Sequence, residues 1–125
     1  YIIRTTLYGD EVHTLGRHLL LDLKDCDKEL LNDLDFLKGA LFSVARGTGV
    51  HILGESFHCF EPQGVSGIVL VTGSHICIHT WPELGYAAID IFTYGDLPQP
   101  EDAAKLLVQK LQCQSPSIVE LKRGF

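Results

Sequence analysis

Long apolar stretches are missing from this sequence, and methionine is absent altogether. No segment approaches the roughly 18 consecutive apolar residues that a membrane-spanning helix needs. The longest apolar runs, such as 19–21 and 68–71, have the length of strands. Residues 1–4 also lack the basic head and long apolar core of a secretory signal peptide. We therefore expect no membrane partner.

Positive charge is scarce as well. Ten Lys and Arg residues stand against 16 Asp and Glu residues, which gives a formal net charge of −6, and Lys122-Arg123 is the one basic cluster. Nucleic-acid binding depends on neutralising phosphates with basic side chains. The charge pattern therefore argues against a nucleic-acid partner and is compatible with a small cationic substrate.

Closely spaced cysteine pairs are also lacking, because the four cysteines lie far apart with no CxxC motif. Reduced thiols in a cytoplasmic protein are the default interpretation of such a pattern. In an oxidising compartment, the pairs Cys26–Cys59 or Cys77–Cys113 would be the alternatives. We expect a cytoplasmic location.

What the sequence does contain is typical of one globular domain over residues 1–125, with residues 1–12 as an N-terminal extension. Period-two and apolar segments predict strands, and apolar residues at helical spacing predict two helices. One helix runs from Asn32 or Asp33 to Ala45 and is ended by Gly47 and Gly49; the other starts after Pro100. The predicted strands are 18–23, 50–60, 66–71, 75–80, 86–92 and 117–121.

This order of elements predicts an α+β fold. Short connections between consecutive strands favour antiparallel pairing, so we expect one antiparallel sheet with two helices on one face, a two-layer sandwich. The other face of the sheet also needs a cover. A second copy of the chain is the simplest one, which predicts a homodimer through the sheet side or edge.

Residues 73–83, GSHICIHTWPE, hold the highest density of reactive groups. On a strand, His75, Cys77 and His79 share one face, and Ser74 points to the other. Ser74 and His79 can therefore cooperate only if the chain turns near Gly73, which glycine makes easy. A zinc site on His75, Cys77 and His79 is a weaker alternative, since no fourth ligand stands out.

From about Leu15 to Gly124 the sequence resembles the bacterial and archaeal class of S-adenosylmethionine decarboxylases. The segments that carry the resemblance are LGRHLLLD (15–22), CD (26–27), LLND (30–33), SFH (56–58), PQGVSG (62–67), SHICIHTWPE (74–83), GYAAIDIF (85–92) and ELKRG (120–124). Long motifs in this order are far more specific than a short pattern match.

The resemblance implies a proenzyme that cuts itself between Gly73 and Ser74. Ser74 would then become a covalent pyruvoyl cofactor, whose carbonyl condenses with the substrate amine as a Schiff base. His79 would assist processing as acid or base, with Ser66 as a helper; an imidazole titrates near neutral pH and suits this proton transfer.

The resemblance also implies the substrate. S-adenosylmethionine would be decarboxylated to supply aminopropyl groups for spermidine synthesis. Phe60, Trp81 and Glu83 match positions near the substrate, and an aromatic face and a carboxylate both attract a sulfonium cation. By default, Phe60 and Trp81 would be core residues and Glu83 a solvated turn residue.

The sequence departs from the family pattern at two positions. Gly73 replaces the usual Glu before the serine, although another pyruvoyl family, the aspartate decarboxylases, also cuts a Gly-Ser bond. Tyr94 stands where the family keeps the Cys that donates a proton to the substrate carbon, and Cys77 or Cys59 could substitute for it. Two alternatives therefore stay open: decarboxylation of arginine or ornithine, and an unprocessed, catalytically silent paralogue acting as a regulatory subunit.

Overall fold

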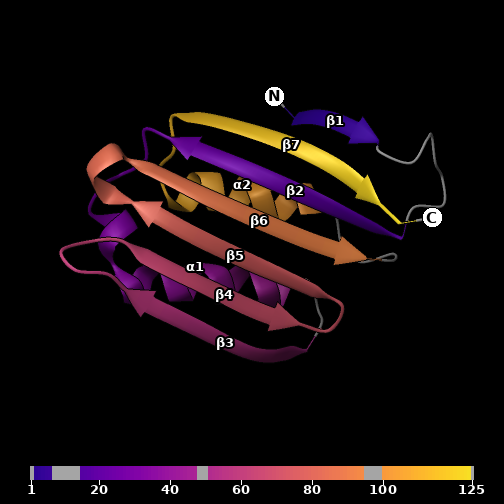
Figure 1. Cartoon of the computed structure of the whole chain (residues 1–125), viewed down its shortest axis with the longest axis horizontal. Coiled ribbons are helices and arrows are strands. Elements are labelled where there is room, and N and C mark those ends of the chain that lie inside the picture. The colour runs from indigo at the N-terminus through magenta and orange to yellow at the C-terminus, as the bar shows by residue number, and fades with distance from the viewer. Residues whose placement is uncertain (1, 7–14, 48–50, 95–99, 125) are drawn as a thin grey trace.

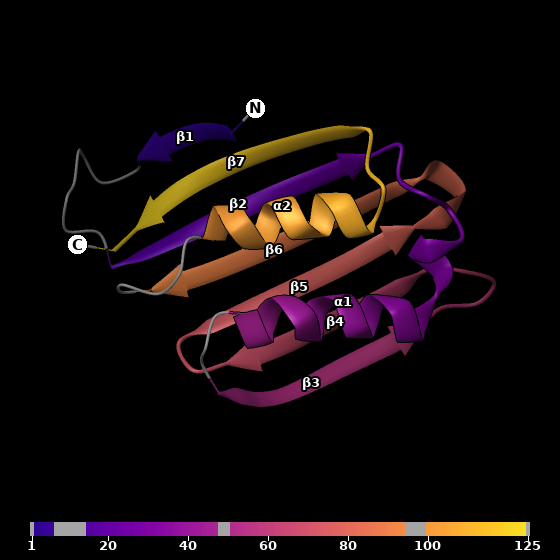
Figure 2. The same ribbon diagram turned by 180° about the vertical axis from the view of Figure 1, so that it is seen from behind.

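The protein forms a single twisted sheet with two helices packed on one of its faces, as the computed structural model shows (Figures 1 and 2). The structure describes residues 2–6, 15–47, 51–94 and 100–124. The strands are β1 (Ile2–Thr6), β2 (Gly16–Lys24), β3 (Ile52–Cys59), β4 (Val65–Val71), β5 (Ser74–Trp81), β6 (Tyr86–Tyr94) and β7 (Ser115–Arg123). The helices are α1 (Leu34–Gly47) and α2 (Pro100–Lys110), and short 3₁₀ turns occupy η1 (Leu30–Asn32) and η2 (Pro82–Leu84).

The strands follow the order β1-β7-β2-β6-β5-β4-β3 across the sheet. Strands β2 to β7 pair antiparallel with one another, which confirms the predicted α+β sheet. The N-terminal extension adds an unpredicted feature, because β1 within it pairs parallel with β7. Its remaining residues, 1 and 7–12, lie outside the described residues.

Helix α1 starts directly after Asp33, one of the two residues that the sequence predicted at its start, and the Asp33 side chain explains this. The Asp33 carboxylate accepts a hydrogen bond from the Phe36 backbone N–H at 3.0 Å, so Asp33 is the N-cap residue and the helix follows it. At the other end the helix includes Gly47, while the predicted stop at Gly49 lies outside the described residues. The helix packs Leu37, Leu41 and Val44 against the sheet.

Helix α2 is tied to the sheet by charge as well as by apolar packing. Arg17 of β2 forms ion pairs with Glu101 in the first turn of α2 and with Glu120 of β7. The Glu120 side chain is fully buried. Burial acts to lower the pKa of Arg17, but its hydrogen bonds to the two carboxylates and their charges outweigh this effect and raise the pKa.

The two faces of the sheet differ sharply, and this difference positions the site. Both helices lie on the same face (Figure 2) and cover a core of Leu, Ile and Val side chains. On the opposite face, which we call the open face, Ile68, Leu70, Trp81 and Tyr94 are each more than a third exposed.

Among the described residues, no helix is both long and apolar enough to cross a membrane.

Candidate active site at the β4–β5 hairpin

Ser74 is the first residue of β5 and follows a two-residue hairpin turn. Val71 pairs with Ser74, and the intervening Thr72 and Gly73 are exposed. Gly73 adopts a φ of 72°, a left-handed conformation that favours glycine. The Ser74 hydroxyl is buried and has no hydrogen-bond partner among the described residues. A buried hydroxyl without a partner carries a free-energy cost, and such groups call for a functional explanation.

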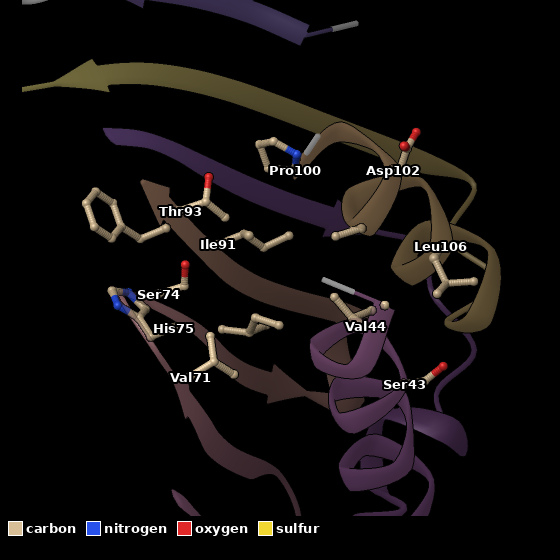
Figure 3. A pocket seen from close by; sticks show the side chains of 14 residues that line it. Ser43, Val44, Val71, Ser74, His75, Ile91, Thr93, Pro100, Asp102 and Leu106 are labelled. Carbon is tan, nitrogen blue, oxygen red and sulfur yellow. The ribbon is translucent and has the colours of Figure 1, made fainter. Parts of the chain in front are cut away.

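A cavity of about 170 Å³ lies beside this hydroxyl, on the helix side of the sheet. Ser43 and Val44 of α1, Leu106 of α2, and Ser74 and Thr93 of the sheet line it (Figure 3). Sequence reasoning missed Thr93. Strand parity was the available signal. Thr93 lies one residue before Tyr94 and so points to the opposite face of β6, which is the buried face on which Ser74 also lies.

Ser66 and His79 meet on the open face, as neighbours on the paired strands β4 and β5. Ser66 Oγ and His79 Nδ1 are 2.7 Å apart and form a hydrogen bond. The pair lies in a shallow depression that Ser56, His58 and Cys77 also line. The hydrogen bond fixes the orientation of the imidazole ring, which is a requirement for an acid or base.

Ser74 and His79 do not come together within one chain. Strand β5 runs without a break from Ser74 to Trp81, so the two side chains lie on opposite faces, roughly 16 Å apart along the strand. The turn occurs at Thr72-Gly73, before Ser74, and it leaves the parity that the sequence predicted in place.

The three residues aligned with substrate contacts lie at the far end of the sheet from Ser74. Phe60 follows β3, Trp81 ends β5 and Glu83 lies in η2; all three are exposed. Trp81 is seven residues from Ser74, roughly 23 Å along the strand. The Trp81 ring stacks on Tyr86 with centroids 5.4 Å apart, and the Phe60 ring contacts His58 at 4.6 Å. Trp81 and Phe60 are therefore surface aromatics and not core residues.

Tyr94 and Gly73, the two positions that depart from the family pattern, are in contact. A Cβ added to Gly73 would clash with Cδ1 and Cε1 of the Tyr94 ring and would lie 3.1 Å from Cζ. The aromatic ring thus covers the α-carbon of Gly73 at the tip of the hairpin. Tyr94 is 43% exposed, and its side chain lies on the open face.

A cluster of histidine and phenylalanine rings lies on the open face close to the hairpin end of the sheet. His18 contacts the Phe92 ring at 5.7 Å and the His75 ring at 6.1 Å. Its Nε2 lies 3.7 Å from Asp90, and Arg123 lies 3.3 Å from its Nδ1. Burial lowers the pKa of His18, Asp90 opposes this, and Arg123 and His75 lower it further.

Within one chain, neither Cys77 nor Cys59, the two thiols that could replace the family's Cys, lies next to Ser74. Cys77 lies three residues along β5 from Ser74, and Cys59 lies at the far end of β3. Burial, followed by the charge of Asp90, raises the pKa of the Cys77 thiol. The described part of the chain contains no group of three or more His, Cys, Asp or Glu side chains that could hold a metal ion.

The profile of the S-adenosylmethionine decarboxylase family matches residues 17–124, and so covers β2 to β7 and both helices. The chain belongs to the S-adenosylmethionine decarboxylase family. The match includes the hairpin, Ser74, the Ser66–His79 pair and Tyr94.

Relatives in this family match nearly the whole chain. The S-adenosylmethionine decarboxylase proenzyme of Thermodesulfovibrio yellowstonii is 46% identical over 114 residues, which cover 91% of this chain and 84% of that protein. The proenzyme of Clostridium kluyveri is 43% identical and covers 91% and 90%. The crystal structure of the adenosylmethionine decarboxylase of Aquifex aeolicus superposes with a TM-score of 0.84 at 29% identity, covering 91% of this chain and 94% of that one.

Proposed function

We propose that this chain is a cytoplasmic S-adenosylmethionine decarboxylase that cuts itself between Gly73 and Ser74 and uses the pyruvoyl group formed from Ser74. Family membership supports the reaction class. The observation that carries the proposal is the Ser74 hydroxyl, which is buried without a hydrogen-bond partner at the start of β5, directly after an exposed glycine turn. A structural serine at this place would be expected to satisfy its hydroxyl.

The proposed cleavage balances without an added oxidant or reductant. Ser74 Oγ attacks the Gly73 carbonyl carbon, the C–N bond breaks and the amine takes up a proton, which leaves an ester. Loss of the Ser74 α-proton and of the Gly73 carboxylate then yields a dehydroalanine, and water replaces its nitrogen, which departs as ammonia. The first piece ends in a carboxylate at Gly73, and the second begins with the ketone at position 74.

The residues around Ser74 fit this group. The cavity beside Ser74 leaves room for the first residue of β5 to rearrange after the cut, and its lining is mostly apolar. A pyruvoyl group supplies an electron-withdrawing carbonyl that accepts the electron pair released as the substrate carboxylate leaves. Tyr94, accessible on the open face beside Gly73, is our candidate for the proton donor to the substrate carbon.

We propose further that the active site is shared between two copies of the chain. Ser74 and Tyr94 lie at one end of the sheet, whereas Phe60, Trp81, Glu83 and the Ser66–His79 pair lie farther along it. One chain therefore cannot bring both sets to one substrate. A dimer that covers the open face, with the two sheets running in opposite directions, would bring the second set of one subunit to the hairpin of the other. The exposed apolar side chains of this face support such a cover.

Intact mass and activity test the first proposal. The wild-type protein is expected to separate, under denaturing conditions, into residues 1–73 and a 74–125 piece that lacks the serine amine and reacts with phenylhydrazine. Ser74→Ala is expected to remain whole and inactive. Carbon dioxide release would be measured with S-adenosylmethionine, arginine and ornithine. A wild-type chain that stays uncut and carries no ketone would contradict the proposal and favour the silent paralogue.

Mixed dimers test the shared site. Ser74→Ala and His79→Ala chains with different tags would be purified separately and then together after co-expression. If the partner's His79 serves Ser74, each variant alone stays uncut, whereas the mixture cuts the His79→Ala chain. Absence of cleavage in the mixture, with heterodimers demonstrated by tag capture, would place both residues in one subunit and overturn the shared site.

A further inference from the structure

Two thiols that the proposed reaction does not use lie together on the far side of the fold from the hairpin. Cys26 follows β2, and Cys113 follows α2. They are 87 positions apart in the sequence, and both are free thiols. The sequence allowed Cys26–Cys59 or Cys77–Cys113 pairs only in an oxidising compartment, whereas the structure places Cys26 beside Cys113.

Backbone hydrogen bonds hold the two loops together on both sides of the cysteines. The Asp27 N–H donates to the Leu111 carbonyl at 3.1 Å, and the Gln114 N–H donates to the Asp25 carbonyl at 3.2 Å. The Ser115 hydroxyl adds a bond to the Asp25 carboxylate at 2.9 Å. Bonds of this kind resemble those of paired strands, whose facing Cα atoms are about 4.5–5.5 Å apart. That spacing lies within the range that a disulfide bridges.

The side chains point to the same place. The Cys26 thiol donates to the Leu23 carbonyl at 3.5 Å, and the Cys113 thiol donates to the adjacent Lys24 carbonyl at 3.1 Å. Cys113 also lies close enough to Cys26 to raise the pKa of the Cys26 thiol. Both sulfur atoms thus lie at the end of β2, next to consecutive carbonyl groups.

The two thiols differ in access. Cys26 is 7% exposed, and its burial, followed by the proximity of Cys113, raises its pKa to about 12. Cys113 is only partly buried. Since the thiolate is the attacking species and must reach its target, Cys113 is the thiol that meets an oxidant, and Cys26 is placed to resolve the product.

We propose that Cys26 and Cys113 form a reversible disulfide on exposure to a small-molecule disulfide such as oxidised glutathione. The Cys113 thiolate attacks one sulfur of the oxidant and releases one thiolate, which gives a mixed disulfide. The Cys26 sulfur loses its proton to solvent, attacks the Cys113 sulfur and releases the second thiolate. The two cysteines are oxidised by two electrons, and the oxidant is reduced to two thiols.

The disulfide would lie next to the end of the sheet where we propose that the substrate contacts Glu83. The Cys26 N–H donates to the Gly85 carbonyl at 2.9 Å, and Gly85 ends the η2 turn that carries Glu83. If the chain is cut as proposed above, Cys26 belongs to the first piece and Cys113 to the second. The disulfide would then join the two pieces covalently, a consequence that rests on the proposed function, whereas the bond itself does not.

Peptide mapping tests the pair in the full-length protein. The chain is incubated with oxidised glutathione, its remaining thiols are alkylated in denaturant, and the digest is read by mass spectrometry. We expect the Cys26 and Cys113 peptides linked, with the loss of two hydrogens. The link should persist in Cys59→Ser and vanish in Cys113→Ser, a conservative change at a partly exposed site, whose folding is checked by thermal unfolding.

The outcomes separate this inference from the proposed reaction. A processed protein is expected to run as one band without reductant and as two bands with it. An uncut protein still reports the linked peptides, so failure of processing leaves the test intact. Links dominated by Cys59 or Cys77, or glutathione adducts without an internal bond, would overturn the proposal.

Discussion

Gly73 and Tyr94 act as one unit at the tip of the β4–β5 hairpin. The ring of Tyr94 occupies the space that any side chain at position 73 would need, and the positive φ of Gly73 adds a second reason for glycine. Aromatic side chains are known to cover glycines in sheets in this way. The two departures from the family pattern are therefore coupled in space, and a Glu cannot be restored at position 73 unless the Tyr94 ring moves.

This coupling predicts a measurable cost. In the uncut Ser74→Ala background, Gly73→Ala is expected to reduce the free energy of unfolding by about 1–3 kcal/mol, because the left-handed backbone and the ring both oppose a Cβ. Tyr94→Ala should relieve part of this loss in the double variant, a coupling that urea unfolding would measure. Gly39→Ala is the matched control: it lies in α1 with nothing within 4 Å of the added Cβ, and it should not destabilise. Additive effects at 73 and 94 would contradict the coupling.

His18 is the second residue with a testable consequence. Its pKa is lowered from 6.5, so near and below that value the unfolded chain binds a proton more readily than the folded one. Stability is therefore expected to fall as the pH drops through 6.5 towards the lower folded value. The charged and titratable groups that face His18 are Asp90, Arg123 and His75. Replacing Asp90 with Asn removes the one charge that opposes the shift.

The measurement is urea unfolding above and below pH 6.5 in the Ser74→Ala background. His18→Gln is expected to reduce the dependence of stability on pH, whereas the same change at the exposed His51 serves as control. An NMR titration of the imidazole should place the His18 midpoint below 6.5. A midpoint above that value would reverse the predicted sign.

At the scale of the elements, Arg17 holds three segments together. It joins β2 to the first turn of α2 through Glu101 and to β7 through Glu120. Helix α2 forms one wall of the cavity beside Ser74. The ion pairs therefore fix part of the site from the helix layer, at a distance from the reacting bond.

Replacing Arg17 should reduce the free energy of unfolding far more than replacing a surface cation. Arg17→Met leaves the fully buried Glu120 without its arginine, and we expect a loss on the order of 3 kcal/mol in unfolding free energy. Lys38→Met is the matched control, since Lys38 pairs with Glu55 at 3.0 Å between partly exposed side chains. Such a pair contributes about 0–1 kcal/mol. Equal losses in the two variants would show that burial of Glu120 does not set the cost.

The elements were largely predictable from the sequence, and their contacts were predictable only in part. Apolar alternation indicated six strands and both helices, but the strand ends were missed, because Gly16, Arg17 and Ser115 join the sheet through backbone hydrogen bonds and not through hydrophobic burial. The parallel pairing of β1 has no local signal of its own. Long-range neighbours such as Cys26 and Cys113 depend on where two loops end, which spacing does not encode.

For the candidate site, too, some features were predictable from the sequence and others were not. Strand parity alone placed Ser74 and His79 on opposite faces, and the structure confirms it. The Ser66–His79 contact could also have been found, since a two-residue turn at Thr72-Gly73 pairs Val71 with Ser74 and therefore Ser66 with His79. The unpartnered state of the Ser74 hydroxyl and the contact between Gly73 and Tyr94 depend on three-dimensional packing, which strand parity does not specify.

At the scale of the whole molecule, the sheet order intermingles the two products of the proposed cut. Reading across the sheet, β1, β2, β3 and β4 belong to the first product and β5, β6 and β7 to the second, yet β7 lies between β1 and β2, and β6 lies between β2 and β5 (Figure 1). Each product thus supplies strands that the other needs as neighbours. Neither product can dissociate without breaking the strand pairing at the centre of the sheet.

The interleaved strands would therefore make the proposed cut an irreversible event for folding. Before the cut, the molecule assembles from a single polymer at a rate independent of its concentration. After cleavage and denaturation, two separate polypeptides would have to associate before refolding, so the refolding rate would fall on dilution. The peptide bond at the hairpin tip would therefore have to break only after the sheet has formed.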